Sequence, residues 1–178
     1  MVLASRGEQP GLGRLGLGID LGSSGLRLAV VDATGEQLYS QASPYPAPFP
    51  DPQGWRSGLM DLCRQLPGPI RAAIGAIALD GTSGTLLLCR ADGSLAGGAL
   101  GQALPYHQAC PEHQAQAQAI VGADSPAASA SGSLARALRL LEMADGAGSP
   151  GPWLLRHQAD WLMGWLDRKS TRLNSSHA

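Results

Sequence analysis

The sequence predicts an α/β fold that begins with a three-strand antiparallel meander and continues with a helix and further strands. Two apolar runs, residues 15–20 and 26–32, are separated only by Leu21 and the tight turn Gly22-Ser23-Ser24-Gly25. This pattern indicates a strand, a turn and a strand, and not a strand followed by a helix. A third run near residues 36–41 alternates apolar and polar side chains, as a further strand does.

The middle of the chain alternates between helical and strand patterns. Four prolines between residues 44 and 50 predict an extended loop. Residues 53–66 then carry apolar side chains at helical spacing. Residues 70–79 supply another apolar strand, expected mainly at residues 73–79. Residues 85–89 and 94–96 flank the turn Ala91-Asp92-Gly93, which predicts a hairpin.

The last third of the body is predicted to be mainly helical. We expect helices at residues 112–121, 133–144 and 157–166, and a short strand at 153–155. The apolar face expected for the second of these helices comprises Leu134, Ala137, Leu138 and Leu141. Together these elements predict one domain of ordinary size for a chain of 178 residues, 44% of them apolar.

Charge and cysteine content exclude several classes of protein. The net charge is −1 and no basic patch is visible, so we expect no nucleic-acid partner. No apolar run approaches the roughly 18–20 residues of a membrane span, and no secretory signal is visible. The three cysteines lack a CxxC spacing, which favours reduced thiols in a cytoplasmic protein over zinc ligands. The oligomeric state stays open.

The turn after Asp20 is the strongest candidate for a ligand site. Glycines let a backbone come close to a ligand, and the hydroxyls of Ser23 and Ser24 add donors. A carboxylate at the end of a strand, here Asp20, can hold Mg²⁺ directly or through water. The alternative is a purely structural hairpin closed by glycine and serine.

Three segments resemble a known family. Gly18-Ile19-Asp20-Leu21-Gly22-Ser23-Ser24-Gly25, followed by Arg27, is similar to the first phosphate motif of the actin-like ATPase superfamily, and most of all to the FGGY carbohydrate kinases. Residues 77–88 resemble the strand, sugar-site loop and strand of that family, and residues 157–162 a later helix start. The resemblance covers residues 15–166 and is nearest to the D-ribulose kinase and xylulokinase branch.

The resemblance implies an actin-like (ribonuclease H-like) domain that transfers the γ-phosphoryl group of ATP to a pentulose, D-ribulose or D-xylulose, with Mg²⁺. The residues expected on the phosphate and Mg²⁺ side are Asp20, Gly22, Ser23, Ser24 and Arg27. Those expected on the sugar side are Asp80, Gly81, Thr82, Ser83, Tyr106, His107 and Gln108. Arg27 could instead be a solvated strand residue, and Asp80 a turn-forming residue.

One segment departs from the family pattern. Family members commonly carry Tyr or Trp, then Asn-Asp, a spacer and Arg, whereas this chain reads Tyr106-His107-Gln108-Ala109-Cys110. Glutamine keeps hydrogen bonding but loses the charge, and cysteine cannot replace a guanidinium group. The identity of the sugar is therefore open.

The last twelve residues differ in composition from the rest. Lys169 is the only lysine and Asn174 the only asparagine, while the other twelve basic residues are arginine. The segment also resembles a translated sequencing adapter, although a short polar C-terminus is the ordinary alternative. We expect a flexible N-terminus at 1–14, a truncated kinase domain at 15–166 and an artefactual tail at 167–178.

This organisation has a consequence for activity. The resemblance implies that the catalytic base and the adenosine-binding motifs lie in a C-terminal part that this chain lacks, so we expect the fragment to be inactive. The alternative function is an ATP-binding switch domain of the actin or chaperone type. That class lacks a polar sugar loop after the strand that ends near Leu79.

Overall fold

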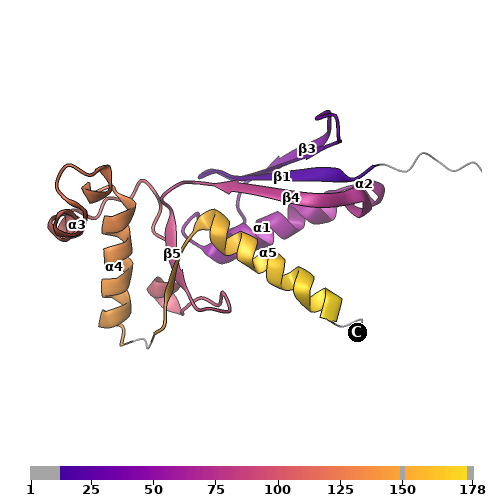
Figure 1. The fold of residues 1–178 in the computed structure, drawn as a ribbon. Helices are drawn as coiled ribbons and strands as arrows, with labels where there is room; N and C mark the ends of the chain where they lie inside the picture. The colour runs from indigo at the N-terminus through magenta and orange to yellow at the C-terminus, as the bar shows by residue number, and fades with distance from the viewer. Residues whose placement is uncertain (1–12, 149–150, 176–178) are drawn as a thin grey trace, which may run out of the picture.

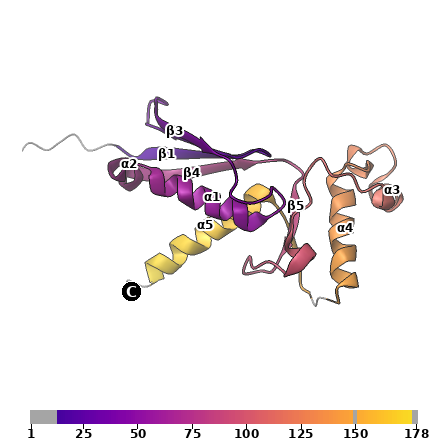
Figure 2. The same cartoon turned by 180° about the vertical axis from the view of Figure 1, so that it is seen from behind.

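The computed structural model describes residues 13–148 and 151–175. Most of the N-terminal segment expected to be flexible, residues 1–12, lies outside the described residues, as do residues 176–178 of the expected tail. A four-stranded sheet with helices α1 (Pro52–Gln65) and α5 (Gln158–Ser175) on one side forms one part of the molecule (Figures 1 and 2). A smaller part contains a two-stranded sheet and helices α3 (Gln114–Val121) and α4 (Ser133–Gly146).

The larger sheet has the strand order β3-β2-β1-β4. Its strands are β1 (Leu15–Leu21), β2 (Leu26–Val31), β3 (Gln37–Ser43) and β4 (Ile74–Gly81). β2 runs antiparallel to both β1 and β3, while β4 runs parallel to β1. The predicted three-strand meander is confirmed.

The side chains of β1 alternate between a buried and an open face. Leu15, Leu17, Ile19 and Leu21 are buried, whereas Gly16 and Gly18 are partly exposed and Asp20 is exposed. This is the period-2 pattern of a strand with one face on the core. All charged and small residues of β1 therefore share the open face of the sheet.

Helix α1 (Pro52–Gln65) covers the buried face. It begins at the N-cap Asp51, whose side chain accepts a hydrogen bond from the Gln53 N–H, as such caps do. Trp55, Leu59 and Leu62 enter the core with the apolar side chains of β1 and β2. The helix lies so close to the sheet that a Cβ on Gly58 would come within 2.6 Å of Leu26 Cδ1.

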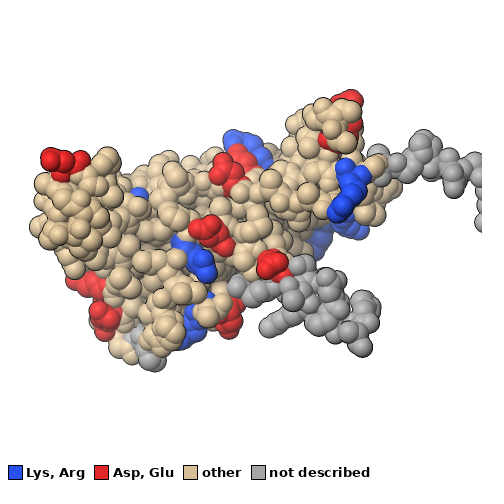
Figure 3. Space-filling model, viewed as in Figure 1, with Lys and Arg blue, Asp and Glu red and all other residues tan. Residues whose placement is uncertain are grey.

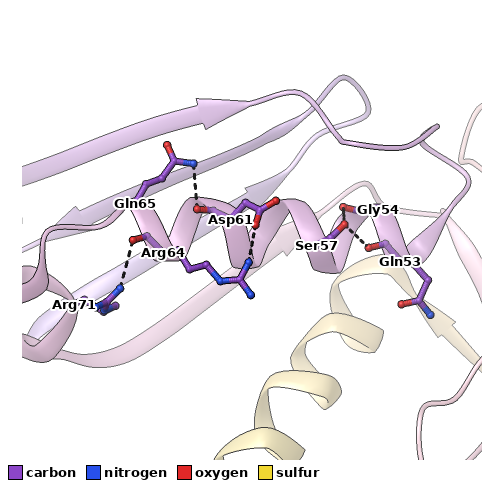
Figure 4. Close-up of polar contacts among 7 residues, drawn as sticks. All are labelled: Gln53, Gly54, Ser57, Asp61, Arg64, Gln65 and Arg71. Atoms are coloured by element: carbon purple, nitrogen blue, oxygen red, sulfur yellow. Dashed lines mark hydrogen bonds and ion pairs between the residues drawn. The ribbon is translucent and has the colours of Figure 1, made fainter.

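The outer side of α1 is polar (Figure 4). Asp61 and Arg64 form an exposed ion pair at 2.7 Å, and the Gln65 amide donates to the Asp61 carbonyl. Arg71 donates to the Arg64 carbonyl from helix α2 (Gly68–Ala73). Helix α2 was not predicted, although the strand expected mainly at residues 73–79 is present as β4.

The smaller sheet adds to one expectation. β5 (Leu86–Cys89) pairs antiparallel with β6 (Leu154–His157), and all four β5 residues are buried. The hairpin predicted around Ala91-Asp92-Gly93 survives only as an isolated bridge between Cys89 and Leu95. The predicted turn does form, because the Arg90 N–H donates to the Ser94 carbonyl at 2.9 Å. Cys89 pairs with both Leu95 and Leu154, so the short hairpin coexists with the longer pairing to β6, which the sequence did not predict.

Helix α4 (Ser133–Gly146) exists as predicted, but its buried face differs from the predicted one. Leu134 and Leu138 are only half-buried and Leu141 is exposed. The buried side chains are Ala135, Arg136, Ala137, Leu140 and Ala144. Helix α3 (Gln114–Val121) and a 3₁₀ turn at Pro111–His113 pack beside it.

Helix α5 (Gln158–Ser175) is longer than expected. Trp161 and Leu162 are buried in the core beside Trp55, and the Trp55 and Trp161 rings meet edge to face at 6.2 Å. The backbone stays helical past residue 166, where the composition suggested a boundary. The domain boundary expected at residue 166 stays a prediction. A continuous helix does not test it, because a helix can extend into a following segment whatever the origin of that segment.

Candidate functional site

The turn between β1 and β2, residues 22–25, stands at one end of the open face. Asp20 and Arg27 are cross-strand partners in the β1–β2 register, and Arg27 Nη1 lies 2.9 Å from Asp20 Oδ2. Their side chains are 51% and 65% exposed, respectively. An ion pair in such an exposed place contributes little to stability, so both groups can exchange this contact for a ligand at small cost.

Asp80 lies beside Asp20, at the end of β4. The parallel register pairs Asp20 with Asp80 and Gly18 with Ala78. Asp80, Asp20 and Arg27 thus form a row across three adjacent strands, all of them exposed. The sequence grouped Asp80 with the sugar loop, whereas the sheet register puts its Cα opposite that of the residue expected to hold Mg²⁺.

The open face next to this row is a groove. It has a volume of about 730 Å³ and takes residues from all four strands, including Gly18, Ala29 and Ala78. The groove exists because these side chains are too small to fill the face. In the orientation of Figure 3, charged residues of both signs, several of them side by side, are spread over a largely uncharged surface.

The backbone of Ser43 and the hydroxyl of Tyr45 contact the β1–β2 turn. A Cβ on Gly25 would lie 2.5 Å from the Ser43 carbonyl oxygen, so the backbone of β3 requires glycine there. The Gly22 carbonyl accepts a 2.7 Å hydrogen bond from the Tyr45 hydroxyl. Ser23 and Ser24 are exposed, which leaves the side of the turn away from Tyr45 open to a ligand.

The loop of residues 81–84 begins at the last residue of β4 and turns one side chain inward. Thr82 donates from its backbone N–H and from its hydroxyl to the Gln158 amide oxygen, at 3.1 and 2.9 Å. Ser83 is exposed, and Gly81 lies against Gln158 and Ala159. Of the predicted sugar-side residues in this loop, Ser83 is the exposed one.

The loop of residues 105–108 lies against the 81–84 loop. The Tyr106 N–H donates to the Thr85 hydroxyl at 3.1 Å. The side chains of Tyr106, His107 and Gln108 are exposed, and the first two rings meet edge to face at 5.2 Å. The structure therefore brings the two predicted sugar segments together, although they are about twenty residues apart in the chain.

Arg136 joins these two loops from helix α4. Only 3% of the residue is exposed, and its guanidinium group donates to four backbone carbonyls. The acceptors and distances are Gly84 at 2.8 Å, Tyr106 at 2.8 Å, Gln108 at 3.1 Å and Ser131 at 2.8 Å. Burial lowers the pKa of the guanidinium group, and the carbonyl dipoles compensate for the lost water.

Gly84 makes this arrangement possible. Its φ is +80°, and a Cβ there would lie 2.7 Å from Arg136 Nη2. Sequence analysis gave Arg136 no role, because it inferred the buried face of this helix from apolar residues alone. A signal was available, since Arg136, Leu140 and Ala144 follow one another at helical spacing.

The place of the expected family arginine is closed to solvent. Cys110 is only 1% exposed, and its N–H donates to the Ala130 carbonyl at 2.7 Å. Burial raises the pKa of its thiol, so the group is neutral near pH 7. Cys110 packs with Ala135 and Leu140 as a small apolar residue.

The carboxylates fit a magnesium ion held largely by water and phosphate. Within the described residues no cluster of three His, Cys, Asp or Glu side chains could bind a metal. Mg²⁺ in phosphoryl-transfer sites uses one or two carboxylates, waters and phosphate oxygens, and Asp20 and Asp80 are such a pair.

Among residues 13–148 and 151–175, no helix has the length and apolar character needed to span a membrane.

No family model matches the chain. Several solved structures are similar to it. A xyloylose kinase from Brucella ovis superposes with a TM-score of 0.62 at 20% identity, over 85% of this chain and 34% of its own length. Plasmodium falciparum glycerol kinase with ADP superposes with a TM-score of 0.58 at 12% identity, over 83% of this chain and 33% of its own. The chain has the actin-like ATPase fold.

A xylulose kinase from Bifidobacterium adolescentis is similar over a shorter stretch, with a TM-score of 0.50 at 20% identity, over 64% of this chain and 22% of its own. These three similar structures are all kinases. The chain spans about one third of the length of the first two. The predicted fold class is confirmed.

Proposed function

We propose that this chain is the N-terminal part of an ATP-dependent sugar kinase. One observation carries the proposal. Asp20, Asp80 and the β1–β2 turn meet at the ends of two parallel strands, beside a polar loop, in a fold shared with sugar kinases. In open α/β sheets, ligands bind at the carboxyl ends of the strands.

The phosphate side would use the turn and the carboxylate row. Asp20, with Asp80, would hold Mg²⁺ through water, and the ion neutralises charge on the transferred phosphate. Arg27 stands next to the turn, since its Nη1 lies 3.9 Å from the position of a Cβ on Gly22. It would leave Asp20 to pair with a phosphate oxygen, for which its planar fork is suited.

The sugar side would use the exposed groups of the two loops. Ser83, Tyr106, His107 and Gln108 offer hydroxyl, imidazole and amide groups that can bind sugar hydroxyls. The substrate proposed from the sequence resemblance is a pentulose, D-ribulose or D-xylulose. The catalytic base would come from a C-terminal part. Residues 15–166 alone would therefore bind ligands without turning them over. The proposed location of the protein is the cytoplasm.

Nuclear magnetic resonance of the ¹⁵N-labelled chain tests the proposal. D-ribulose or D-xylulose should shift the amide signals of residues 81–84 and 105–108, while Mg-ATP should shift those of residues 22–25. D-ribose, an aldose with the same atoms, is the control and should shift them less. A coupled assay of ATP consumption should detect no turnover by this chain.

Two results would contradict the proposal. If Mg-ATP shifts the turn and no ketose shifts either loop, the chain is an ATP-binding switch domain of the actin type. If neither ligand shifts any signal of a folded chain, the β1–β2 turn is a structural hairpin.

A further inference from the structure

A continuous path of hydrogen bonds connects the β1–β2 turn with the two loops. We call it the Gln158 relay. Its members are, in order, Tyr106, Thr85, Thr82, Gln158, Tyr45 and Gly22. The donor–acceptor distances along it are 3.1, 2.6, 2.9, 3.3 and 2.7 Å. Gln158, the first residue of α5, stands in the middle.

The chemistry of the groups fixes the direction of the central bonds. The Thr82 N–H can only donate, so the Gln158 atom that it meets is the amide oxygen. The Gln158 amide nitrogen therefore donates to the Tyr45 hydroxyl oxygen. The Tyr45 hydroxyl must in turn donate to Gly22, because a carbonyl only accepts.

The same reasoning orients the two threonines. The Thr82 hydroxyl gives its one hydrogen to the Gln158 oxygen, so it must accept from the Thr85 hydroxyl. The Thr85 oxygen accepts from the Tyr106 N–H. All five bonds thus run one way, and bonds aligned in this manner strengthen one another.

Burial makes the relay sensitive to any change in a member. Gln158 and Thr85 have no exposed surface. Burial also raises the pKa of Tyr45 to about 12, so its hydroxyl keeps its proton at neutral pH. A buried polar group that loses its hydrogen-bond partner is strongly disfavoured, and this holds both ends of the relay to one arrangement.

The relay also directs backbone groups outward. The Gly22 carbonyl and the Ser23 N–H belong to one planar trans peptide and point in opposite directions. Because Tyr45 holds the carbonyl inward, the Ser23 N–H points away from Tyr45, toward the open side of the turn. We infer that Gln158 is a positioning residue that sets the β1–β2 turn relative to the 81–84 and 105–108 loops.

For ligands, this inference rests on the proposed function, in which the turn meets phosphate and the loops meet sugar. Glutamine suits the place because one side chain must accept from Thr82 and donate to Tyr45. Glutamate has nearly the same shape but, when ionised, has no donor. In Gln158→Glu the Tyr45 hydroxyl would turn its hydrogen to the carboxylate, and Gly22 would lose its donor.

The experiment compares Gln158→Glu and Gln158→Leu with Gln116→Leu, a matched change at an exposed glutamine of α3. In Gln158→Glu the Ser23 amide signal should move away from its wild-type position at high pH. It should return as acid protonates the glutamate, which is then a donor again. Asp20 is a charged group that acts on Tyr45. Asp20→Asn in the Gln158→Glu background therefore shows whether the pH response of Ser23 comes from the glutamate.

Ligand binding gives the second measurement. In Gln158→Leu, ketose affinity and Mg-ATP affinity should both fall about tenfold, the factor expected for about one net hydrogen bond. Gln116→Leu should change neither. If Gln158→Leu does not fold, the titration of Gln158→Glu decides the question.

The readouts separate failure of this inference from failure of the proposed function. If the wild-type chain binds no ketose and no Mg-ATP, the proposed function is wrong, yet the Ser23 titration still supports the positioning role. A Ser23 signal that keeps its wild-type position in Gln158→Glu at every pH would overturn the relay. So would a Gln158→Leu chain that binds both ligands as the wild type does.

Discussion

The β1–β2 turn and the two loops opposite it differ in how far along the chain their supporting residues lie. Asp20 and Arg27 are seven residues apart and meet through the register of one hairpin. The 81–84 and 105–108 loops are held by Arg136, which is 52 residues from Gly84, and by Gln158, which is 76 residues from Thr82. The first half of the candidate site is local and exposed, whereas the second is assembled around buried polar groups.

This difference predicts where substitutions should damage the fold. An exposed ion pair exchanges easily with water, while a buried donor that is removed leaves its acceptors without partners. Changes beneath the loops should therefore affect stability more than changes at the turn, and changes at the turn should affect ligand binding more than stability.

Arg136→Met should have the largest effect. It keeps much of the side-chain length but removes the donors to four carbonyls, and we expect a loss of at least about 3 kcal/mol in the free energy of unfolding. Urea denaturation followed by circular dichroism measures it. Arg139→Met, on the same helix but 41% exposed, is the control. Equal losses in the two variants would show that the carbonyl contacts of Arg136 carry no special weight.

Gly84→Ala should come next. Its positive φ costs an alanine roughly 1–2 kcal/mol, and the added Cβ would also crowd Arg136 Nη2 at 2.7 Å. Gly35→Ala isolates the first contribution, since Gly35 has a φ of +86° with nothing within 4 Å of its Cβ position. We expect Gly84→Ala to lose about 1 kcal/mol more than Gly35→Ala by urea denaturation. A smaller loss at Gly84 would mean that the guanidinium group moves aside freely.

Asp20→Asn should change stability by no more than about 1 kcal/mol, because the pair with Arg27 is exposed. It should nevertheless abolish the Mg-ATP-dependent amide shifts at residues 22–25. Asp61→Asn, which breaks the exposed pair with Arg64, is the matched control and should leave those shifts intact. An Asp20→Asn chain that responds to Mg-ATP like the wild type would remove Asp20 from the ion-binding role.

Asp32 should give the smallest effect, confined to acid. Hydrogen bonds from the Thr34 hydroxyl and then from backbone N–H groups hold its pKa below the usual 3.8. A lowered folded-state pKa means that its contribution is present above the unfolded-state value and is lost as pH falls through the folded-state value. The urea midpoint of Asp32→Asn should therefore depend less on pH below 3.8 than that of the wild type. Identical acid profiles would contradict this.

Much of the fold could be predicted from the sequence because strand and helix periodicity are local properties. The meander, the glycine-serine turn and helices α1 and α4 follow from residues that are neighbours in the chain. The pairing of β5 with β6 could not be predicted, because Leu154 lies 65 residues beyond its partner Cys89 and periodicity reports only on neighbouring residues. The buried face of α4 was mistaken because the spacing of apolar residues alone was used, whereas the packing buries Arg136 and exposes Leu141.

The candidate site shows the same division between contacts that are local in the sequence and contacts between distant segments. By itself the sequence determined that Asp20, the β1–β2 turn and Arg27 come together, since a hairpin with a short turn allows one register and alternating side chains share a face. Only the tertiary structure decided that Asp80 stands beside Asp20, that Thr82 turns inward, and that Arg136 and Gln158 hold the loops. Those contacts depend on how distant segments pack. A buried donor or acceptor takes whichever partner that packing brings within reach.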